Sequence, residues 1–501
     1  MPKHAKWLIG GVWGTFMLIY ALISFPNHFN FRTAGTELAY SMQVMEYHLR
    51  GHLIPRQLSV TNPFVDTEGW RIDSHASPSV ITALPFYWLG GAWGLLVHQW
   101  LMIGCMGVGF FIYAYQRTGL WQAGFWTMTH FLGMWGVYSL MGWDWHELVC
   151  GIVWMPWFWY AIEQKKPWLF FVSWLLFIGG KENFTLWGVW IGFILMWIYR
   201  SREQRRWLLI GTAVALIWFV IGYFLYKGGE KGLSRLYLYA YLGAKDPLAV
   251  VEGRETSVSF SFFSVVKTIL LRPQFIWTLL FESPRLDPST FELHWAVLWS
   301  GGWSFAVEPA FLLLLLPVYL YKLLSADYLL WGTLYHYSME FAAILPLAVL
   351  WTAERWKGRW PFYAVLVGGA LGAHFMSFSL MDSRYSKWYD PLRHRWYSRE
   401  HYCSPYSYWK IHEGLKVIPR EASVSAAATL IPHIPARLEY YHFPATKHVD
   451  YIALLRHNTA PWPLTPAEME KYIDSLERAP QWEKIWDRHK LVIFRRKKGS
   501  E

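Results

Sequence analysis

The chain is poor in charge and in cysteine, and each shortage excludes a class of protein. Only 16% of its 501 residues are charged, fewer than expected of a soluble protein of this length. Its three cysteines, Cys105, Cys150 and Cys403, lie far apart without CxxC spacing, so we expect neither a structural disulfide nor a cysteine zinc site. The sequence also lacks a complete P-loop, a nucleophile elbow, an HExxH motif and a dinucleotide fingerprint. The sequence therefore does not indicate a P-loop or dinucleotide-binding protein, a hydrolase with a nucleophile elbow, or an HExxH metalloprotease.

Apolar side chains, by contrast, are abundant. Hydrophobic residues make up 54% of the chain, which has 35 tryptophans. Several apolar runs reach about 17 to 23 residues, the length needed to cross roughly 30 Å of hydrocarbon. We therefore predict an all-α polytopic membrane protein of about 11 transmembrane helices, with a small C-terminal α/β domain. The net charge of +11 does not indicate nucleic acid, because the basic residues lie in short loops between spans, where they set orientation.

The basic loops predict the orientation in the membrane. The first span, 7–24, follows Lys3 and Lys6 and lacks a cleavage pattern, so it should remain, with the N-terminus in the cytoplasm. The arginines and lysines of 163–166 and 200–206 should also be inside. Counting from these loops gives the other predicted spans: 95–115, 119–140, 148–162, 167–180, 183–199, 207–226, 288–304, 308–324, 336–353 and 361–380. The same count predicts that Glu37, His75, Asp144, His146, Lys181 and Glu182 share the outer, periplasmic side.

Two domains are expected. Residues 1–381 form the transmembrane domain, with a large first outer loop at 25–77 and a short apolar helix, 78–93, in the outer interface. Residues 382–501 are charged, aromatic and polar, and predict a soluble α/β domain outside the membrane. Within it we expect strands at 422–426, 437–442, 451–455 and 490–494, and helices at 427–435 and 465–476. The second helix carries a capping box, with Thr465 at the N-cap and Glu468 three residues later.

The segment Trp143–Glu147 sets two acids and an imidazole between apolar runs. Ionisable groups at membrane depth are costly, so Asp144 and His146 are candidates for function. An interfacial loop, with tryptophans at the headgroups and acids in water, explains the same segment. Glu37 has two explanations as well. It can act as a general base or metal-binding carboxylate, or it can be an acid favoured by a helix N-terminus.

Two further outer segments carry candidate groups. His75 can bind a phosphate, ligate a metal or shuttle a proton, or it can belong to a capping segment ahead of Pro78. Lys181 can meet a phosphate as a point charge, although a pair with Glu182 satisfies it equally. His336 lies in a short outer loop between two tyrosines.

Four short motifs together resemble the domain of unknown function 2079 family, bacterial multi-pass membrane proteins usually grouped with the GT-C glycosyltransferase-like fold. The motifs are Glu37-Leu38 with Gln43, His75–Ile81 with Leu84–Tyr87, Trp143–His146, and Gly180–Glu182. A C-terminal run from Ile418 to Tyr451 also fits. Two positions depart from the pattern. The family tends to have Asp where Glu37 stands, and a second acid where Met42 stands.

The resemblance implies a bacterial inner-membrane enzyme that takes a sugar from a polyprenyl-phosphate carrier at the periplasmic face, among membrane lipids and without nucleic acid. It implies Glu37 as the base, supported by Asp144 and His146, with His75 and Lys181 at the carrier phosphate. Further substrate-binding candidates are Gln43, Glu182 and His336. The sequence leaves open whether Glu37, Asp144 and His146 share a divalent metal ion. Two other classes also stay open: a transporter or flippase of lipid-linked or anionic substrates, using Glu308 or His374, and a non-catalytic envelope assembly protein.

Overall fold

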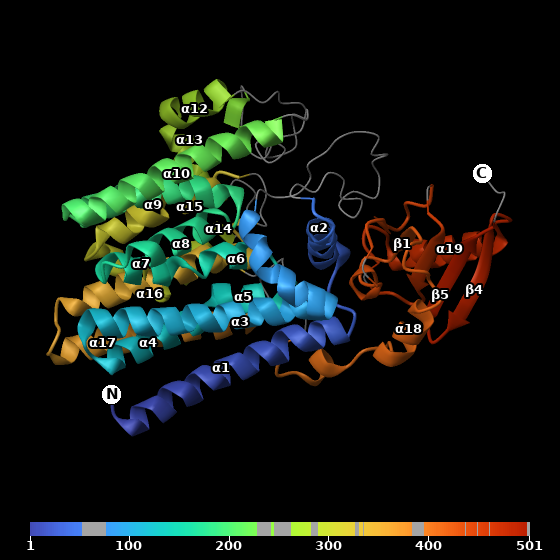
Figure 1. The fold of residues 1–501 in the computed structure, drawn as a ribbon, viewed down its shortest axis with the longest axis horizontal. Coiled ribbons are helices and arrows are strands. Elements are labelled where there is room, and N and C mark those ends of the chain that lie inside the picture. Colours follow the sequence, from blue (N-terminus) through green and yellow to red (C-terminus); the bar gives the residue numbers. More distant parts are fainter. Residues whose placement is uncertain are drawn as a thin grey trace.

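The computed structural model describes residues 1–52, 77–227, 242–244, 262–281, 289–325, 330–333, 335–382, 395–435, 437–447, 449–459 and 461–497. A bundle of helices is followed by a small C-terminal domain built on a five-stranded sheet (Figure 1). The N-terminus and the C-terminal domain lie at opposite ends of the bundle. His75 lies outside the described residues, so its role stays a prediction.

Apolar helices form the bundle. They are α1 (Lys3–Phe29), α2 (Tyr40–Leu49), α3 (Leu84–Thr118), α4 (Trp121–Leu132), α5 (Trp135–Gly142), α6 (Leu148–Ile152), α7 (Met155–Glu163), α8 (Pro167–Ile178), α9 (Glu182–Ile198), α10 (Arg202–Lys227), α12 (Phe262–Leu271), α13 (Pro273–Phe281), α14 (Ser289–Trp299), α15 (Pro309–Leu323), α16 (Met339–Glu354) and α17 (Trp360–Asp382). Four shorter turns join them: η1 (Gly35–Ala39, a π-helix), η2 (Pro78–Ala83), η4 (Gly302–Ala306) and η6 (His336–Ser338). Large apolar side chains such as Trp7, Leu371 and Phe375 remain exposed, as expected of surfaces that face lipid.

The number of membrane spans differs from the prediction. Among the described residues, four helices are long and apolar enough to cross a membrane: Lys3–Phe29, Pro78–Thr118, Arg202–Gly222 and Trp360–Leu380. A pair bent by 89°, Phe263–Leu271 with Pro273–Phe281, makes five if it counts as one span. The predicted count of about 11 is therefore not confirmed. The reason is that some apolar runs are broken or short: 119–140 divides into α4 and α5, and α8 has only 12 residues where a full crossing needs about 20.

A break in the backbone lies near the end of the apolar stretch 78–93, inside α3. Gly91 has φ 55° and ψ −131°, a conformation that glycine adopts without the steric cost of a side chain. The stretch thus comprises η2 and the first turns of α3. Its position in a membrane interface remains a proposal.

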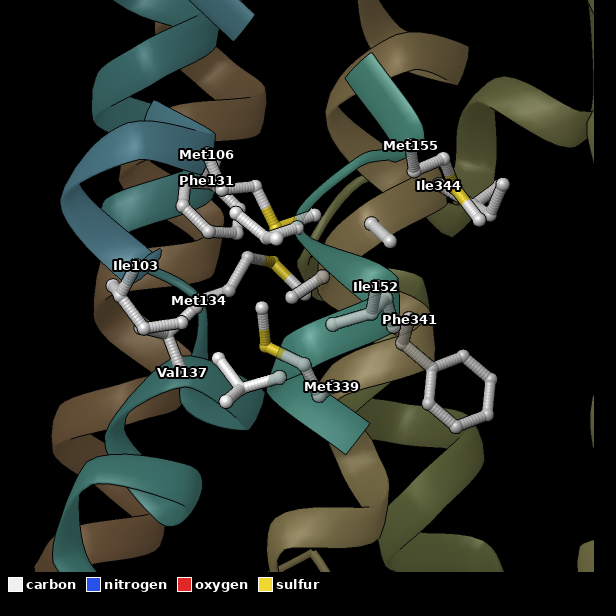
Figure 2. Close-up of a cluster of buried hydrophobic side chains, with 14 of the residues drawn as sticks. Ile103, Met106, Phe131, Met134, Val137, Ile152, Met155, Met339, Phe341 and Ile344 are labelled. Carbon is white, nitrogen blue, oxygen red and sulfur yellow. The ribbon is translucent and has the colours of Figure 1, made fainter. Parts of the chain in front are cut away.

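The core of the bundle is rich in methionine where its broken helices meet. Figure 2 shows Met106 of α3, Met134 between α4 and α5, Met155 of α7 and Met339 of α16 gathered with aliphatic and aromatic side chains. Methionine has an unbranched, flexible side chain that fills irregular gaps. This packing holds the start of α16 against α5, and both lead into the loops of the candidate site.

The C-terminal domain contains β1 (Val424–Ala426), β2 (Tyr440–His442), β3 (Tyr451–Leu455), β4 (Trp482–Arg488) and β5 (Leu491–Arg496), in the order β2-β1-β3-β5-β4. Strand β1 is parallel to β2 and β3, whereas β5 is antiparallel to β3 and β4. Its helices are α18 (Tyr408–Leu415) and α19 (Pro466–Arg478), with short 3-10 turns η7 (Arg399–Tyr402) and η8 (Ile431–His433).

Several local predictions for this domain can be compared with the structure. The capping box of α19 is confirmed, since Thr465 accepts from the Glu468 N–H and the Glu468 carboxylate accepts from the Thr465 N–H. The helix predicted at 427–435 is wrong, because only η8 forms in a segment interrupted by Pro432 and Pro435. Strand β4 was not predicted. Its charged residues are typical of an edge strand, which weakens the alternating pattern.

The segment after α1 attaches the C-terminal domain to the bundle. The Arg32 guanidinium donates to the carbonyl oxygens of Glu400, His401 and Cys403 at 2.6 to 2.8 Å. The ring of Phe29 stacks on that of Tyr408 with centroids 4.6 Å apart. The end of α1 is therefore fixed to the C-terminal domain.

Candidate functional site

The loops predicted to be inside meet at one end of the bundle. Arg117 at the end of α3 donates to Glu354 at the end of α16 across 2.6 Å and is also paired with Glu163 at the end of α7. The Tyr199 hydroxyl donates to Glu163 at 2.6 Å. The basic loops therefore share one end, which we call the basic end.

The opposite end holds the candidate site, and close backbone contacts build it. A side chain at Gly136 of α5 would collide with the carbonyl oxygen of Ser338, so this glycine lets η6 lie directly against α5. A Cβ on Gly151 of α6 would come within 2.6 Å of the Gly180 Cα. These two approaches bring the turn before α9 and the turn before α16 against the loop that joins α5 to α6.

A chain of ionisable groups results. The Lys181 Nζ lies 3.2 Å from the Glu147 Oε1 and 3.3 Å from the His146 Nε2. The same Nε2 lies 4.0 Å from the Glu37 Oε2 of η1. The structure thus connects three predicted residues, Glu37, His146 and Lys181, through adjacent contacts.

Burial distinguishes the members of this chain. The side chain of Glu37 is 26% exposed, against 2% for His146, 7% for Glu147 and 4% for Lys181. A molecule approaching from solvent therefore meets Glu37 first. The groups behind it are positioned to act on it through charge and hydrogen bonding, in surroundings where electrostatic interactions are stronger than in water.

His336 completes the cluster from η6. Its ring lies against that of His146, with centroids 3.9 Å apart, and against that of Tyr337 at 4.0 Å. The ring is buried, and within the part of the chain that the structure describes neither nitrogen has a hydrogen-bond partner. Buried polar groups are nearly always bonded, so this imidazole is an exception that calls for an explanation.

A family model described as "Predicted membrane protein (DUF2079)" matches residues 27–493. The chain belongs to this family. No curated protein matches the DUF2079 chain. The solved structures that resemble it include ArnT from Cupriavidus metallidurans bound to undecaprenyl phosphate, at 11% identity and a TM-score of 0.48, and ArnT from the same organism in the apo state, at 10% identity and a TM-score of 0.47. The first covers 97% of this chain and 98% of its own, and the second 96% and 97%. Both TM-scores lie below 0.5, so this likeness alone carries no functional conclusion.

Asp144 of the DUF2079 chain has a structural contact beside its predicted role. Its carboxylate accepts from the Ala34 N–H at 2.7 Å, which fixes the residue preceding η1 and so the turn that carries Glu37. The loop itself is held by Gln99 of α3, which donates to the Asp144 carbonyl and accepts from the His146 N–H, both at 3.0 Å. The sequence prediction missed Gln99, and its only signal was an amide within an apolar run.

Two further predicted substrate-binding residues of the DUF2079 chain are Gln43 and Glu182. Gln43 of α2 is buried and donates to the Leu438 carbonyl, which joins α2 to the C-terminal domain. Glu182 is in the first turn of α9, where an acid is favoured by the helix dipole. Glu147, which the sequence analysis did not assign a role, pairs with Lys181.

The sequence analysis left open whether Glu37, Asp144 and His146 share a divalent metal ion. Within the described ranges, no group of three or more His, Cys, Asp or Glu side chains is arranged to hold a metal ion. Glu37 and His146 are neighbours, but the Asp144 carboxylate accepts from the backbone of Ala34.

Proposed function

We propose that this protein is a membrane glycosyltransferase-like enzyme of the GT-C type, which moves a sugar from a polyprenyl-phosphate carrier to an acceptor. The observation that supports it is the contact between partly exposed Glu37 and buried His146, 4.0 Å apart at the end of the bundle opposite the basic end. We assign this end to the periplasmic face of the bacterial inner membrane, because basic loops favour the cytoplasm.

In this proposal Glu37 is the general base. An acceptor hydroxyl attacks the anomeric carbon of the donor sugar, and its proton passes to the Glu37 carboxylate. The bond from that carbon to the phosphate oxygen breaks, and polyprenyl phosphate leaves with the electron pair. His146 holds the carboxylate in place from behind, and Asp144 fixes the turn that carries it.

We assign the carrier phosphate to Lys181, His336 and the undescribed His75. Lys181 is paired with Glu147 at 3.2 Å, and its ammonium group has three N–H donors, so a phosphate oxygen shares the ammonium group with the Glu147 carboxylate or replaces it. The unpartnered nitrogens of His336 supply a hydrogen-bond donor next to it. No step passes through a metal ion.

The test uses the purified full-length protein and a panel of radiolabelled polyprenyl-phosphate sugars, with label in an acceptor fraction as the readout. Glu37→Gln should abolish transfer while the protein still accumulates in the membrane. Glu46→Gln is the matched control, since Glu46 lies on α2 and is paired with Arg50 at 3.2 Å. Full transfer by Glu37→Gln would refute the assignment.

Among the described residues, no observation specifically favours a transporter or flippase, or a non-catalytic assembly protein. Glu308, the candidate for a transport path, is paired with Arg355 at 2.8 Å beside the basic end. His374 lies 2.6 Å from the Ala370 carbonyl of its own helix. An assembly protein would depend on residues 382–501 rather than on Glu37, which the same variant also tests.

A further inference from the structure

A second candidate site lies at the basic end, between α8 and α10. A cavity of about 500 Å³ there is lined by Phe171, Arg202, Glu203, Arg206, Trp207 and Ile210. It is connected with the basic end because the Gln204 amide donates to the Ile162 carbonyl at the end of α7, at 3.0 Å. No residue of the proposed enzyme site contributes to it.

The first turns of α10 divide their side chains between two faces. Gln204 is bonded to α7, and the Arg205 Nε donates to the carbonyls of Met196 and Tyr199, each at 3.2 Å. Arg202 and Arg206 are one helical turn apart, so they point to the same face, which is the face of the cavity. Two guanidinium groups are thereby presented together.

Neither guanidinium is engaged by the protein. Both side chains are exposed, and in the described part of the chain neither makes a hydrogen bond or an ion pair. Glu203, also in the lining, offsets one of the two positive charges. Two arginines and one glutamate leave a net charge of +1, which favours an anion over a zwitterion.

The other walls of the cavity are apolar and continue along the helix. Trp207 is buried and stands 6.3 Å from the ring of Phe170 of α8. Leu209, Ile210 and Ile217 remain exposed along Arg202–Gly222, a helix apolar enough to span a membrane. Cationic groups above a tryptophan and an exposed apolar surface match the headgroup, interface and chain region of a lipid.

We propose that this cavity binds an anionic phospholipid. Arg202 and Arg206 hold the headgroup phosphate, to which a guanidinium can donate two parallel hydrogen bonds. The acyl chain lies over Trp207 and Ile210. Glu203 weakens the attraction, so the site combines two cations that favour the anionic lipid with one acid that opposes it.

The experiment measures binding of phosphatidylglycerol and phosphatidylcholine to the purified full-length protein by native mass spectrometry. We expect the wild type to prefer phosphatidylglycerol. Arg202→Gln with Arg206→Gln should reduce that preference by about tenfold or more, since charge-assisted hydrogen bonds are lost. Glu203→Gln should increase it. Lys357→Gln with Arg359→Gln is the matched control, because both side chains are exposed at the basic end but outside the cavity.

Three results would overturn the proposal. One is equal binding of the two lipids by the wild type. Another is an equal loss in the control and in the Arg202/Arg206 variant, which would mean a general effect of charge. The third is displacement of the lipid by millimolar inorganic phosphate, which would identify a free anion as the ligand.

Discussion

Acidification should release the C-terminal domain from the helical bundle. Three imidazoles join the two parts: the ring of His433 stacks on that of His28 with centroids 4.2 Å apart, and its Nδ1 lies 3.1 Å from the Nε2 of His412. Tyr408 packs against His412 at 4.1 Å, and Lys416 is the cation that faces it from its own helix. Any proton added here places positive charge among groups that are already crowded and mostly buried.

The size of the effect follows from the pKa values. Burial, together with Lys416, lowers the pKa of His412 from 6.5 to about 4. Burial and the two neighbouring imidazoles lower the pKa of His433 well below 6.5. Release that exposes these two rings to water lets them bind protons below pH 6.5 that they do not bind when docked, so docking is strongest above pH 6.5 and weakens as the pH falls towards 4. At about 1.4 kcal/mol per pH unit, the lowered pKa of His412 removes up to about 2 kcal/mol of docking free energy at pH 5, and His433 acts in the same direction.

Amide hydrogen exchange of the full-length protein at pH 7.5 and pH 5, corrected for the intrinsic rate, measures this opening in α18 and in the segment after α1. We expect protection in these segments to fall by about thirtyfold at pH 5. His412→Phe with His433→Phe keeps two aromatic rings and removes the titration, so its protection should vary much less with pH. His4→Phe, at the far end of α1, is the control. Equal protection of the wild type at both pH values would refute the reasoning.

Three further predictions concern stability, measured by thermal unfolding in detergent unless stated. Lys181→Met should destabilise the protein by about 3–5 kcal/mol, because the buried Glu147 loses its lysine partner, and adding Glu147→Gln should recover most of the loss; no recovery would mean that the pair is not coupled. Gly136→Ala should cost about 1–3 kcal/mol by pushing η6 from α5, whereas Gly14→Ala, with no atom within 4 Å of the added carbon, should cost little. Thr465→Ala should remove the cap of α19 and cost about 1 kcal/mol, seen as faster hydrogen exchange in its first turn.

Features set by residues close together in the sequence were predicted, whereas features that depend on residues far apart in the sequence were not. Charge counting predicted that Glu37, His146 and Lys181 share one end of the bundle, and the structure brings them together, because loop side is set by local basic residues. The membrane character and the family were likewise predicted from runs and motifs, and the family match confirms both. Gln99 was missed because its partners, Asp144 and His146, are more than 40 residues away.

The number of spans could not be predicted for a related reason. Residues 133–134 and 153–154 interrupt apolar runs that look continuous in sequence, and the interruptions are made by packing against other helices. The Gly151–Gly180 approach is another long-range contact, visible only after folding, yet it decides that Lys181 pairs with Glu147. Local patterns predicted the elements, while their breaks and closest contacts depended on tertiary structure.

The polar network around Arg117 and the cluster around Lys181 and His336 differ in how completely their hydrogen-bonding groups are paired. At the basic end, Arg117 is paired with Glu163 and Glu354 at once, and the hydroxyls of Tyr113 and Tyr199 donate to Glu163. Such a saturated network needs no ligand to account for it.

At the opposite end, Lys181 and a second buried lysine, Lys322, stand within 5.6 Å of the same Tyr337 ring, and each is paired with a carboxylate. Beside them His336 is buried with both ring nitrogens unbonded among the described residues. Buried ion pairs add little net stability over well-packed apolar groups, and an unbonded imidazole subtracts from it. Folding alone therefore does not explain two adjacent buried ion pairs and an unsatisfied histidine, whereas a polar ligand that bonds to His336 and is attracted by the lysines would.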